Sequence, residues 1–152
     1  MPIGIIESLD HEARGITRLE GKTIFVEGAL PGEKVEYTSF RRKPNYEVAQ
    51  ADRILKASPD RVAPKCPHYG SCGGCSMQHL DSTAQVAAKQ RVLESNLWHL
   101  GRLRAEQLYA PIHGPAWGYR FRARLAALFV AKKGEMLIGF HERKSSYIAD
   151  MT

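Results

Sequence analysis

The chain has 152 residues, enough for one or two small domains, and its 43% hydrophobic and 25% charged content is typical of a globular protein. No window approaches the roughly 18 uninterrupted apolar residues of a transmembrane helix. The N-terminus lacks a basic stretch followed by an apolar run, so no secretory signal is predicted and a cytoplasmic location is expected. An odd number of clustered cysteines in such a chain argues against a disulfide framework and for metal or redox chemistry.

The net charge of +6 is unevenly distributed along the chain. Residues 1–57 hold nine acidic and nine basic residues, whereas the rest of the chain holds thirteen basic against seven acidic residues. A one-sided basic balance suggests a polyanionic partner, most often nucleic acid. The alternative is a basic surface that serves only solubility.

Residues 1–57 are expected to form short strands separated by turns. Thr23–Glu27 is rich in β-branched and aromatic residues, and Val35–Phe40 alternates apolar with polar positions, as a half-buried strand does. Between them, Pro31 and Gly32 stand in the order that a type II turn requires. Five strands are expected, at about Ile3–Ile6, Gly15–Leu19, Thr23–Glu27, Val35–Phe40 and Tyr46–Ile54. So many short strands in so short a segment predict a small closed barrel of the OB type.

Small OB barrels bind single-stranded nucleic acid in a groove that carries basic and aromatic side chains. The candidates here surround one basic turn, and they are Phe40, Arg41, Arg42, Lys43 and Tyr46. Two alternatives stay open. The aromatic rings of Phe25 and Phe40 are expected to lie in the barrel core, and the basic turn could be an ordinary solvated turn.

The same segment resembles a TRAM domain, an OB-like RNA-binding module found on RNA-modifying enzymes. The resemblance covers Gly15–Leu55, and the run Phe25–Val35, with the sequence FVEGALPGEKV, carries most of it. The resemblance implies that residues 1–57 form an RNA-binding TRAM domain.

All three cysteines lie in one loop with the spacing C-x5-C-x2-C, as Cys66, Cys72 and Cys75. Gly73 and Gly74 separate the last two. Thiolates this close, on a backbone this permissive, can converge on one metal centre.

Three interpretations of the loop compete on chemistry alone. A disulfide between Cys72 and Cys75 would leave Cys66 unused. A structural zinc could be completed by His68 or His79, because zinc accepts three cysteines and one histidine. An iron–sulfur cluster would need a fourth ligand that is distant in sequence. Zinc and iron–sulfur are equally compatible with the spacing.

The string from Cys66 to Leu80 resembles the 4Fe–4S motif of bacterial uracil-C5 methyltransferases that act on 23S ribosomal RNA. A TRAM domain directly upstream is the arrangement of the RlmD (RumA) branch of that family. The resemblance implies that Cys66, Cys72 and Cys75 are ligands of a 4Fe–4S cluster, with the fourth cysteine well downstream. No cysteine follows Cys75 in this sequence, so the site is expected to be incomplete in this chain.

Beyond the loop, a helix and a hairpin are expected. Ser82 and Gln85 form a capping-box signature at the start of the helix, and Gly101 is expected to follow its end. Residues 127–130 and 136–140 are expected to pair as a β-hairpin around a turn at 132–135, and a further strand is expected to begin at Tyr147.

Arginines alternate with other residues in Tyr119–Leu125. On a strand, Arg120, Arg122 and Arg124 would share one face, against which RNA phosphates could lie. The alternative is an edge strand protected by its charge.

The expected organisation is mainly β with an α+β second part. Residues 1–57 are the five-stranded TRAM barrel, residues 58–81 the linker and cysteine loop, and residues 82–152 a truncated central domain of one helix and an antiparallel sheet. In the family, a Rossmann-like domain binds S-adenosylmethionine and carries the nucleophilic cysteine, and that domain is expected to be absent here.

The resemblance therefore implies an RNA-binding and cluster-ligating portion of a 23S rRNA methyltransferase, monomeric and not catalytic alone. The alternative is a stand-alone RNA-binding module with a structural zinc site.

Overall fold

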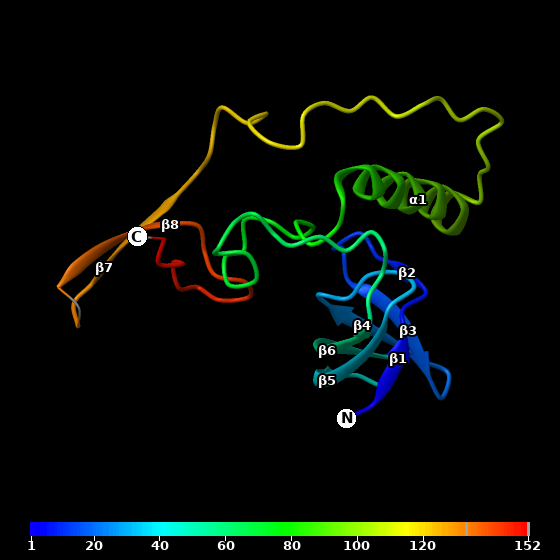
Figure 1. Cartoon of the computed structure of the whole chain (residues 1–152), viewed down its shortest axis with the longest axis horizontal. Helices are drawn as coiled ribbons and strands as arrows, with labels where there is room; N and C mark the ends of the chain where they lie inside the picture. Colours follow the sequence, from blue (N-terminus) through cyan, green and yellow to red (C-terminus); the bar gives the residue numbers. More distant parts are fainter. Residues whose placement is uncertain (133, 152) are drawn as a thin grey trace. The chain divides into compact units, whose positions relative to one another are not determined.

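The computed structural model describes residues 1–132 and 134–151, in which the chain forms two compact units (Figure 1). The first unit comprises Met1–Val62 and His79–Ile112, and the second unit comprises Ala63–Gln78 and His113–Thr152. Lys133, which belongs to the expected hairpin turn, and Thr152 lie outside the described residues.

The first unit is built on a six-stranded sheet. Its strands are β1 (Ile3–Ile5), β2 (Ser8–Leu9), β3 (Gly15–Leu19), β4 (Lys22–Glu27), β5 (Lys34–Arg42) and β6 (Tyr46–Lys56). They lie in the order β1-β5-β6-β4-β3-β2, with β4 and β6 parallel and the other neighbours antiparallel. The mainly β class predicted from the sequence is confirmed, with β2 as a strand that the sequence did not predict.

The two edge strands of this sheet are consecutive in the chain. Ile6 and Glu7 separate β1 from β2, and their N–H groups donate to the carbonyls of Glu33 at 2.9 Å and Ile16 at 2.8 Å. One N-terminal segment therefore pairs at both edges of the sheet, with the buried Ile6 between the two pairings. Closure into a five-stranded barrel stays a prediction.

The core of the first unit follows from strand alternation. Ile24 and Val26 share one face of β4, and Val35 and Tyr37 share one face of β5, because side chains two residues apart lie on the same side of a strand. All four are buried. The buried cluster consists of Ile6, Ile24, Val26, Ala29, Val35, Tyr37 and Ala49. Burial of each large side chain contributes about 1.5–3 kcal/mol.

The expectation that Phe25 and Phe40 lie in the core is wrong. Phe40 is 54% exposed and Phe25 is half-buried outside the core cluster. Phe25 stands between the inward residues Ile24 and Val26 of β4, so it faces the other side. In β5, a register shift between Ser39 and Arg41 breaks the alternation at Phe40.

A buried ion pair fixes the connector that follows β6. The Arg61 guanidinium contacts both carboxylate oxygens of the fully buried Glu33, with Nε and one terminal nitrogen at 2.6 and 2.8 Å, and also donates to the Gly28 carbonyl. The N–H groups of Leu30 and Ser58 complete the site at 2.8 and 3.1 Å. Burial alone would raise the pKa of Glu33, but these hydrogen bonds hold that pKa below its ordinary value.

The connector also pairs with the residues that precede the helix, forming a stem. Its hydrogen bonds run from the Val62 N–H to the His79 carbonyl at 3.0 Å and from the Asp81 N–H to the Asp60 carbonyl at 2.9 Å, around a bridge between Arg61 and Leu80. Residues 63–78, which include the cysteines, leave and re-enter the first unit through this stem. The domain division at residues 57 and 81 stays a prediction.

Helix α1 (Ser82–Gly101) begins and ends one residue away from the predicted signals. Asp81, rather than Ser82, is the N-cap, and its carboxylate accepts from the Thr83 N–H at 2.9 Å. Gly101 is the last helical residue, and Arg102 takes the left-handed conformation that closes the helix. No residue of α1 is buried. Within the described chain, no helix has the length and apolarity needed to cross a membrane.

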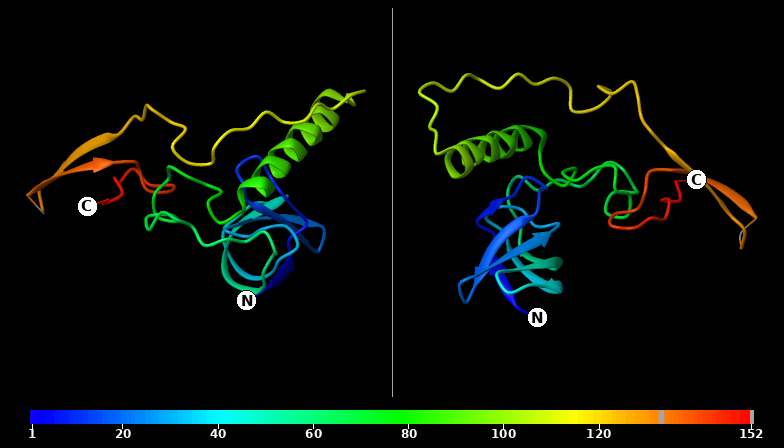
Figure 2. Two further views of the ribbon diagram at one scale, coloured as in Figure 1. Left: turned by 45° about the horizontal axis from the view of Figure 1, so that its top comes forward. Right: turned by 180° about the vertical axis from the view of Figure 1, so that it is seen from behind.

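The second unit contains the predicted hairpin, formed by β7 (Ala126–Val130) and β8 (Glu135–Gly139). The expected strand at Tyr147 is reduced to a single bridge between His141 and Ile148. Residues 103–125 have no helix or strand, as the extended trace in Figure 2 shows.

Candidate RNA-binding surface and cysteine loop

The basic turn of the first unit lies where β5 leads into β6. Arg41 and Arg42 end β5, and a hydrogen bond from the Lys43 N–H to the Tyr46 carbonyl at 2.9 Å closes the turn. All three cations are exposed. The structure thus places the predicted basic residues together on the surface.

One acidic residue offsets part of this charge. Glu47 accepts from Lys22 at 3.0 Å and lies 3.8 Å from the Arg42 Nε. Hydrogen bonds from Ser39 and Lys22 hold the pKa of Glu47 below its ordinary value, so it is ionised at neutral pH. Arg41 has no carboxylate partner among the described residues.

Tyr46 is partly committed to packing. Its ring meets the Phe25 ring edge-on, with centroids 5.9 Å apart at 75°, and the Arg14 guanidinium lies 4.7 Å from the centroid of Phe25. Tyr46 is half-buried as a result. Less of its ring is open to a nucleotide base than the sequence pattern suggests.

The predicted arginine strand is not formed. Arg120, Arg122 and Arg124 are exposed in an irregular segment, and β7 begins only at Ala126. A strand needs a neighbour for its backbone groups, and no described segment pairs with residues 119–125. The three guanidiniums are therefore not aligned on one sheet face, although none forms an ion pair within the described chain.

Charge is also unevenly divided between the two units. The second unit holds eight lysines and arginines against three acidic residues, whereas the first unit holds fourteen against thirteen. Almost all of the net charge therefore belongs to the second unit, which also contains the cysteine loop.

The three cysteines are free thiols in different environments. Cys66 is half-buried, Cys72 is buried and Cys75 is exposed. Their loop is ordered by backbone contacts: the Cys72 N–H donates to the His68 carbonyl at 2.9 Å, and the Cys66 N–H donates to the Gln78 side chain at 3.1 Å.

The cysteine side chains of the loop are suitable metal ligands, but the structure does not bring enough ligating side chains together. The Gly74 N–H points at the Cys72 sulfur at 3.4 Å, a contact of the kind that stabilises a ligating thiolate. Among the described residues, however, no three or more His, Cys, Asp or Glu side chains form a group that could hold a metal ion. Of the two zinc-completing candidates, His68 is half-buried in the loop and His79 is buried in the first unit.

A second segment of the chain pairs with the cysteine loop, and the sequence did not predict it. The Gly73 N–H donates to the His141 carbonyl and the Arg143 N–H donates to the Ser71 carbonyl, both at 2.8 Å. These bonds flank a bridge between Cys72 and Glu142. No spacing or periodicity marks residues 140–144 as neighbours of a loop so distant in sequence.

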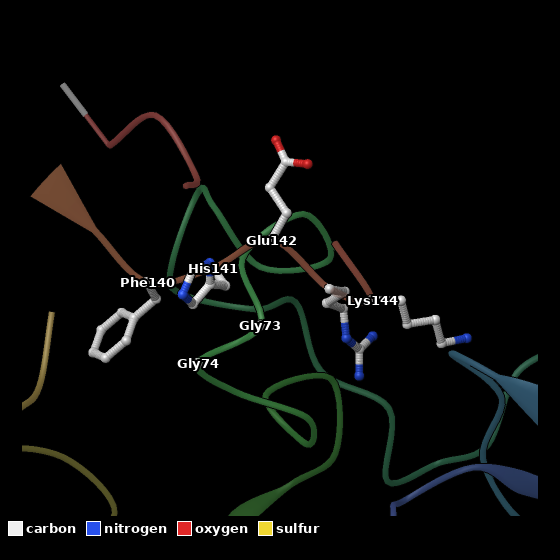
Figure 3. A pocket seen from close by; sticks show the side chains of 7 residues that line it. Gly73, Gly74, Phe140, His141, Glu142 and Lys144 are labelled. Carbon is white, nitrogen blue, oxygen red and sulfur yellow. The ribbon is translucent and has the colours of Figure 1, made fainter. Parts of the chain in front are cut away.

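The glycine pair explains why this approach is so close. A Cβ at Gly73 would lie 2.9 Å from the His141 carbonyl oxygen, and one at Gly74 would lie 3.3 Å from the Phe140 ring. Between the two segments lies a shallow pocket of about 350 Å³, lined by Gly73, Gly74 and Phe140–Lys144 (Figure 3).

Part of the first unit matches a known domain family, and nearly the whole chain is similar to known proteins. The TRAM domain family matches residues 5–46. The chain is 65% identical over 151 residues to the 23S rRNA (uracil(1939)-C(5))-methyltransferase RlmD of Aromatoleum aromaticum, and 67% identical over 151 residues to that of Dechloromonas aromatica. It is 66% identical over 157 residues to the enzyme of the same name from Burkholderia pseudomallei.

Each alignment covers 99% of this chain but only 34–35% of the relative. The chain thus spans about a third of the length of the curated relatives it matches. The resemblance predicted from the sequence is confirmed: the chain contains a TRAM domain and corresponds, over nearly its whole length, to one third of the RlmD-type 23S rRNA uracil-C5 methyltransferases.

Proposed function

We propose that this chain is an RNA-binding portion of a 23S rRNA uracil-C5 methyltransferase of the RlmD type. The observation that carries the proposal is the identity of 64–67% to RlmD enzymes over the whole chain, together with the TRAM match. The exposed basic turn and the basic second unit support it, because Lys and Arg side chains supply the phosphate contacts of RNA-binding proteins.

The RNA-contacting residues proposed are Arg41, Arg42, Lys43, Tyr46, Arg120, Arg122 and Arg124. The first four lie at the β5–β6 turn of the TRAM domain, for which we infer an OB-like closure because β1 and β2 pair at opposite edges of its sheet. The protein is proposed to act as a monomer in the cytoplasm, where ribosomal RNA is found.

The test is binding of the purified chain to single-stranded fragments of 23S rRNA over a range of salt concentrations. Binding that weakens linearly on a logarithmic salt scale is expected, because each phosphate contact releases counterions. An acidic protein of similar size serves as the control. Affinity that is absent at low salt, or that does not depend on salt, would contradict the proposal.

Methyl transfer from S-adenosylmethionine is proposed for the whole enzyme rather than for this chain. Incubation of the chain with labelled S-adenosylmethionine and 23S rRNA fragments is expected to leave the RNA unlabelled. Labelling above that of a reaction without protein would contradict this assignment.

We further infer that Cys66, Cys72 and Cys75 provide three thiolate ligands to a 4Fe–4S cluster. Three free thiols within one loop, and the Gly74 N–H directed at the Cys72 sulfur, support the inference. These three are the only cysteines of the sequence, so a fourth ligand has to be of another kind or come from outside it.

Anaerobic purification followed by iron, sulfide and zinc analysis tests the metal. Iron and sulfide in equal amounts are expected, in a brown protein. One zinc per chain without iron would instead support a structural zinc site in an RNA-binding module. A triple Cys→Ser variant, which removes all the thiols, is the matched control for adventitious metal.

A further inference from the structure

The pocket between the glycine pair and residues 140–144 has no assigned role. It lies wholly within the second unit, and its two walls are held together by backbone hydrogen bonds rather than by mobile side chains. A site whose walls are fixed before binding loses less entropy when a ligand is immobilised. The pocket is therefore suited to recognition.

The lining combines an aromatic ring with cations. Phe140 is half-buried beside Gly74, and Arg143 and Lys144 follow it on the same wall. The only acidic residue of the lining, Glu142, points away from the glycines in Figure 3. Aromatic rings stack with bases and cations pair with phosphates, so this set matches one nucleotide.

The lining also offers a hydrogen-bond acceptor. The Nδ1 atom of His141 lies 3.2 Å from the Ser146 carbonyl oxygen, which can only accept, so Nδ1 carries the proton of the neutral ring. Nε2 is then an acceptor. A ribose 2′-hydroxyl can donate to such an atom, whereas DNA has no equivalent group.

The glycines let the two walls of the pocket approach closely and add no side chain to its lining. Any side chain at Gly73 would meet the His141 carbonyl, and any side chain at Gly74 would meet the Phe140 ring. At Gly73 and Gly74 the lining therefore presents only backbone, which a ligand can approach closely.

We propose that this pocket binds one unstacked nucleotide of single-stranded RNA, with its base against Phe140 and its phosphate at Arg143 and Lys144. The proposal rests on the proposed RNA-binding function and names a contact outside the TRAM domain. It places an RNA contact on the segment that pairs with the cysteine loop.

The test measures binding of a fluorescent oligouridylate to the full chain and to three variants. Phe140→Leu is expected to weaken binding about tenfold without changing the salt dependence, because stacking releases no counterions. Arg143→Gln is expected to lower the salt slope by about 0.7, the contribution of one phosphate contact on a single strand. Phe129→Leu, at an exposed aromatic position of β7 outside the pocket, is the matched control and is expected to bind as the unaltered chain does.

Ultraviolet crosslinking of the unaltered chain keeps the test independent of the folding of variants. Crosslinks to the peptide that contains Phe140 and His141 are expected, and they should be fewer with a DNA oligomer of the same length. If the unaltered chain binds RNA but Phe140→Leu matches Phe129→Leu and no crosslink falls on this peptide, the pocket proposal is overturned while the proposed function stands. If the unaltered chain binds no RNA, both are overturned.

Discussion

The two units of this chain differ in their buried cores and in their charge. The first unit has a continuous buried core and nearly balanced charge. In the described part of the second unit, the buried apolar residues are Cys72, Ile148 and Ala149. In the sequence of that unit, cations outnumber acids by eight to three. Repulsion between closely spaced cations opposes compact packing. Basic residues that could bind a polyanion are therefore more easily accommodated in the unit with the smaller buried core.

The comparison also shows how each unit holds its irregular segments. The first unit fixes its connector through side chains, with the buried pair of Glu33 and Arg61. The second unit fixes the cysteine loop through backbone bonds to residues 141 and 143. A side-chain contact can be removed by substitution, so the contribution of the Glu33–Arg61 pair to stability can be tested directly.

The largest effect is expected for Glu33→Gln. The amide cannot neutralise Arg61 and cannot accept all the hydrogen bonds that the carboxylate receives, so the free energy of unfolding of the first unit should fall by about 3 kcal/mol. Urea denaturation followed by far-ultraviolet circular dichroism measures this loss. Glu12→Gln removes an exposed partner of Arg14 and is the matched control, with a loss below about 1 kcal/mol. Equal losses in the two variants would show that the buried pair does not fix the connector.

Lowering the pH should reduce the difference in unfolding free energy between Glu33→Gln and the unaltered chain. The pKa of Glu33 is lower in the folded state than in the unfolded state, so its contribution is present above an unfolded pKa of about 4.3 and is lost as pH falls through the folded pKa. Denaturation midpoints measured from neutral pH down to about pH 3 should therefore converge. A constant separation across that range would mean that ionisation of Glu33 does not contribute to stability.

An intermediate effect is expected when the basic segments of the two units are compared. Neutralising Arg120, Arg122 and Arg124 to Gln should lower the salt slope of RNA binding by about two, because all three are exposed and without ion pairs in the described chain.

The matching triple substitution of Arg41, Arg42 and Lys43 to Gln should lower the slope by only about 1.4, because Arg42 already lies beside Glu47. Fluorescence titrations at several salt concentrations give both slopes. A larger change at the basic turn than in the arginine segment would assign the main electrostatic contact to the TRAM domain.

The smallest effect concerns the start of α1. Asp81→Ala should lower the urea midpoint, because its carboxylate caps the Thr83 N–H. Ser82→Ala is the control and should change stability little, since Ser82 is the first helical residue rather than the cap. Helix content and urea midpoints distinguish the two, and the opposite order would restore Ser82 as the cap.

Local patterns in the sequence determined much of what was predicted well. Alternation and turn residues identified the mainly β first unit, and the Phe25–Val35 run identified a TRAM domain. The metal site expected from the spacing of Cys66, Cys72 and Cys75 stays a prediction. These signals are local, because each depends on residues that are neighbours along the chain.

Only the tertiary structure decided the remaining features. The face on which Phe40 lies depends on a register shift between paired strands, and the partners of Glu33 and of Gly73 come from segments 28 and 68 residues away. Tyr119–Leu125 has strand-like alternation but no neighbour with which to pair, so its arginines remain in an irregular segment. Backbone and side-chain polar groups form hydrogen bonds with the groups that the fold brings close to them. No periodic pattern in the sequence specifies which distant segments come together.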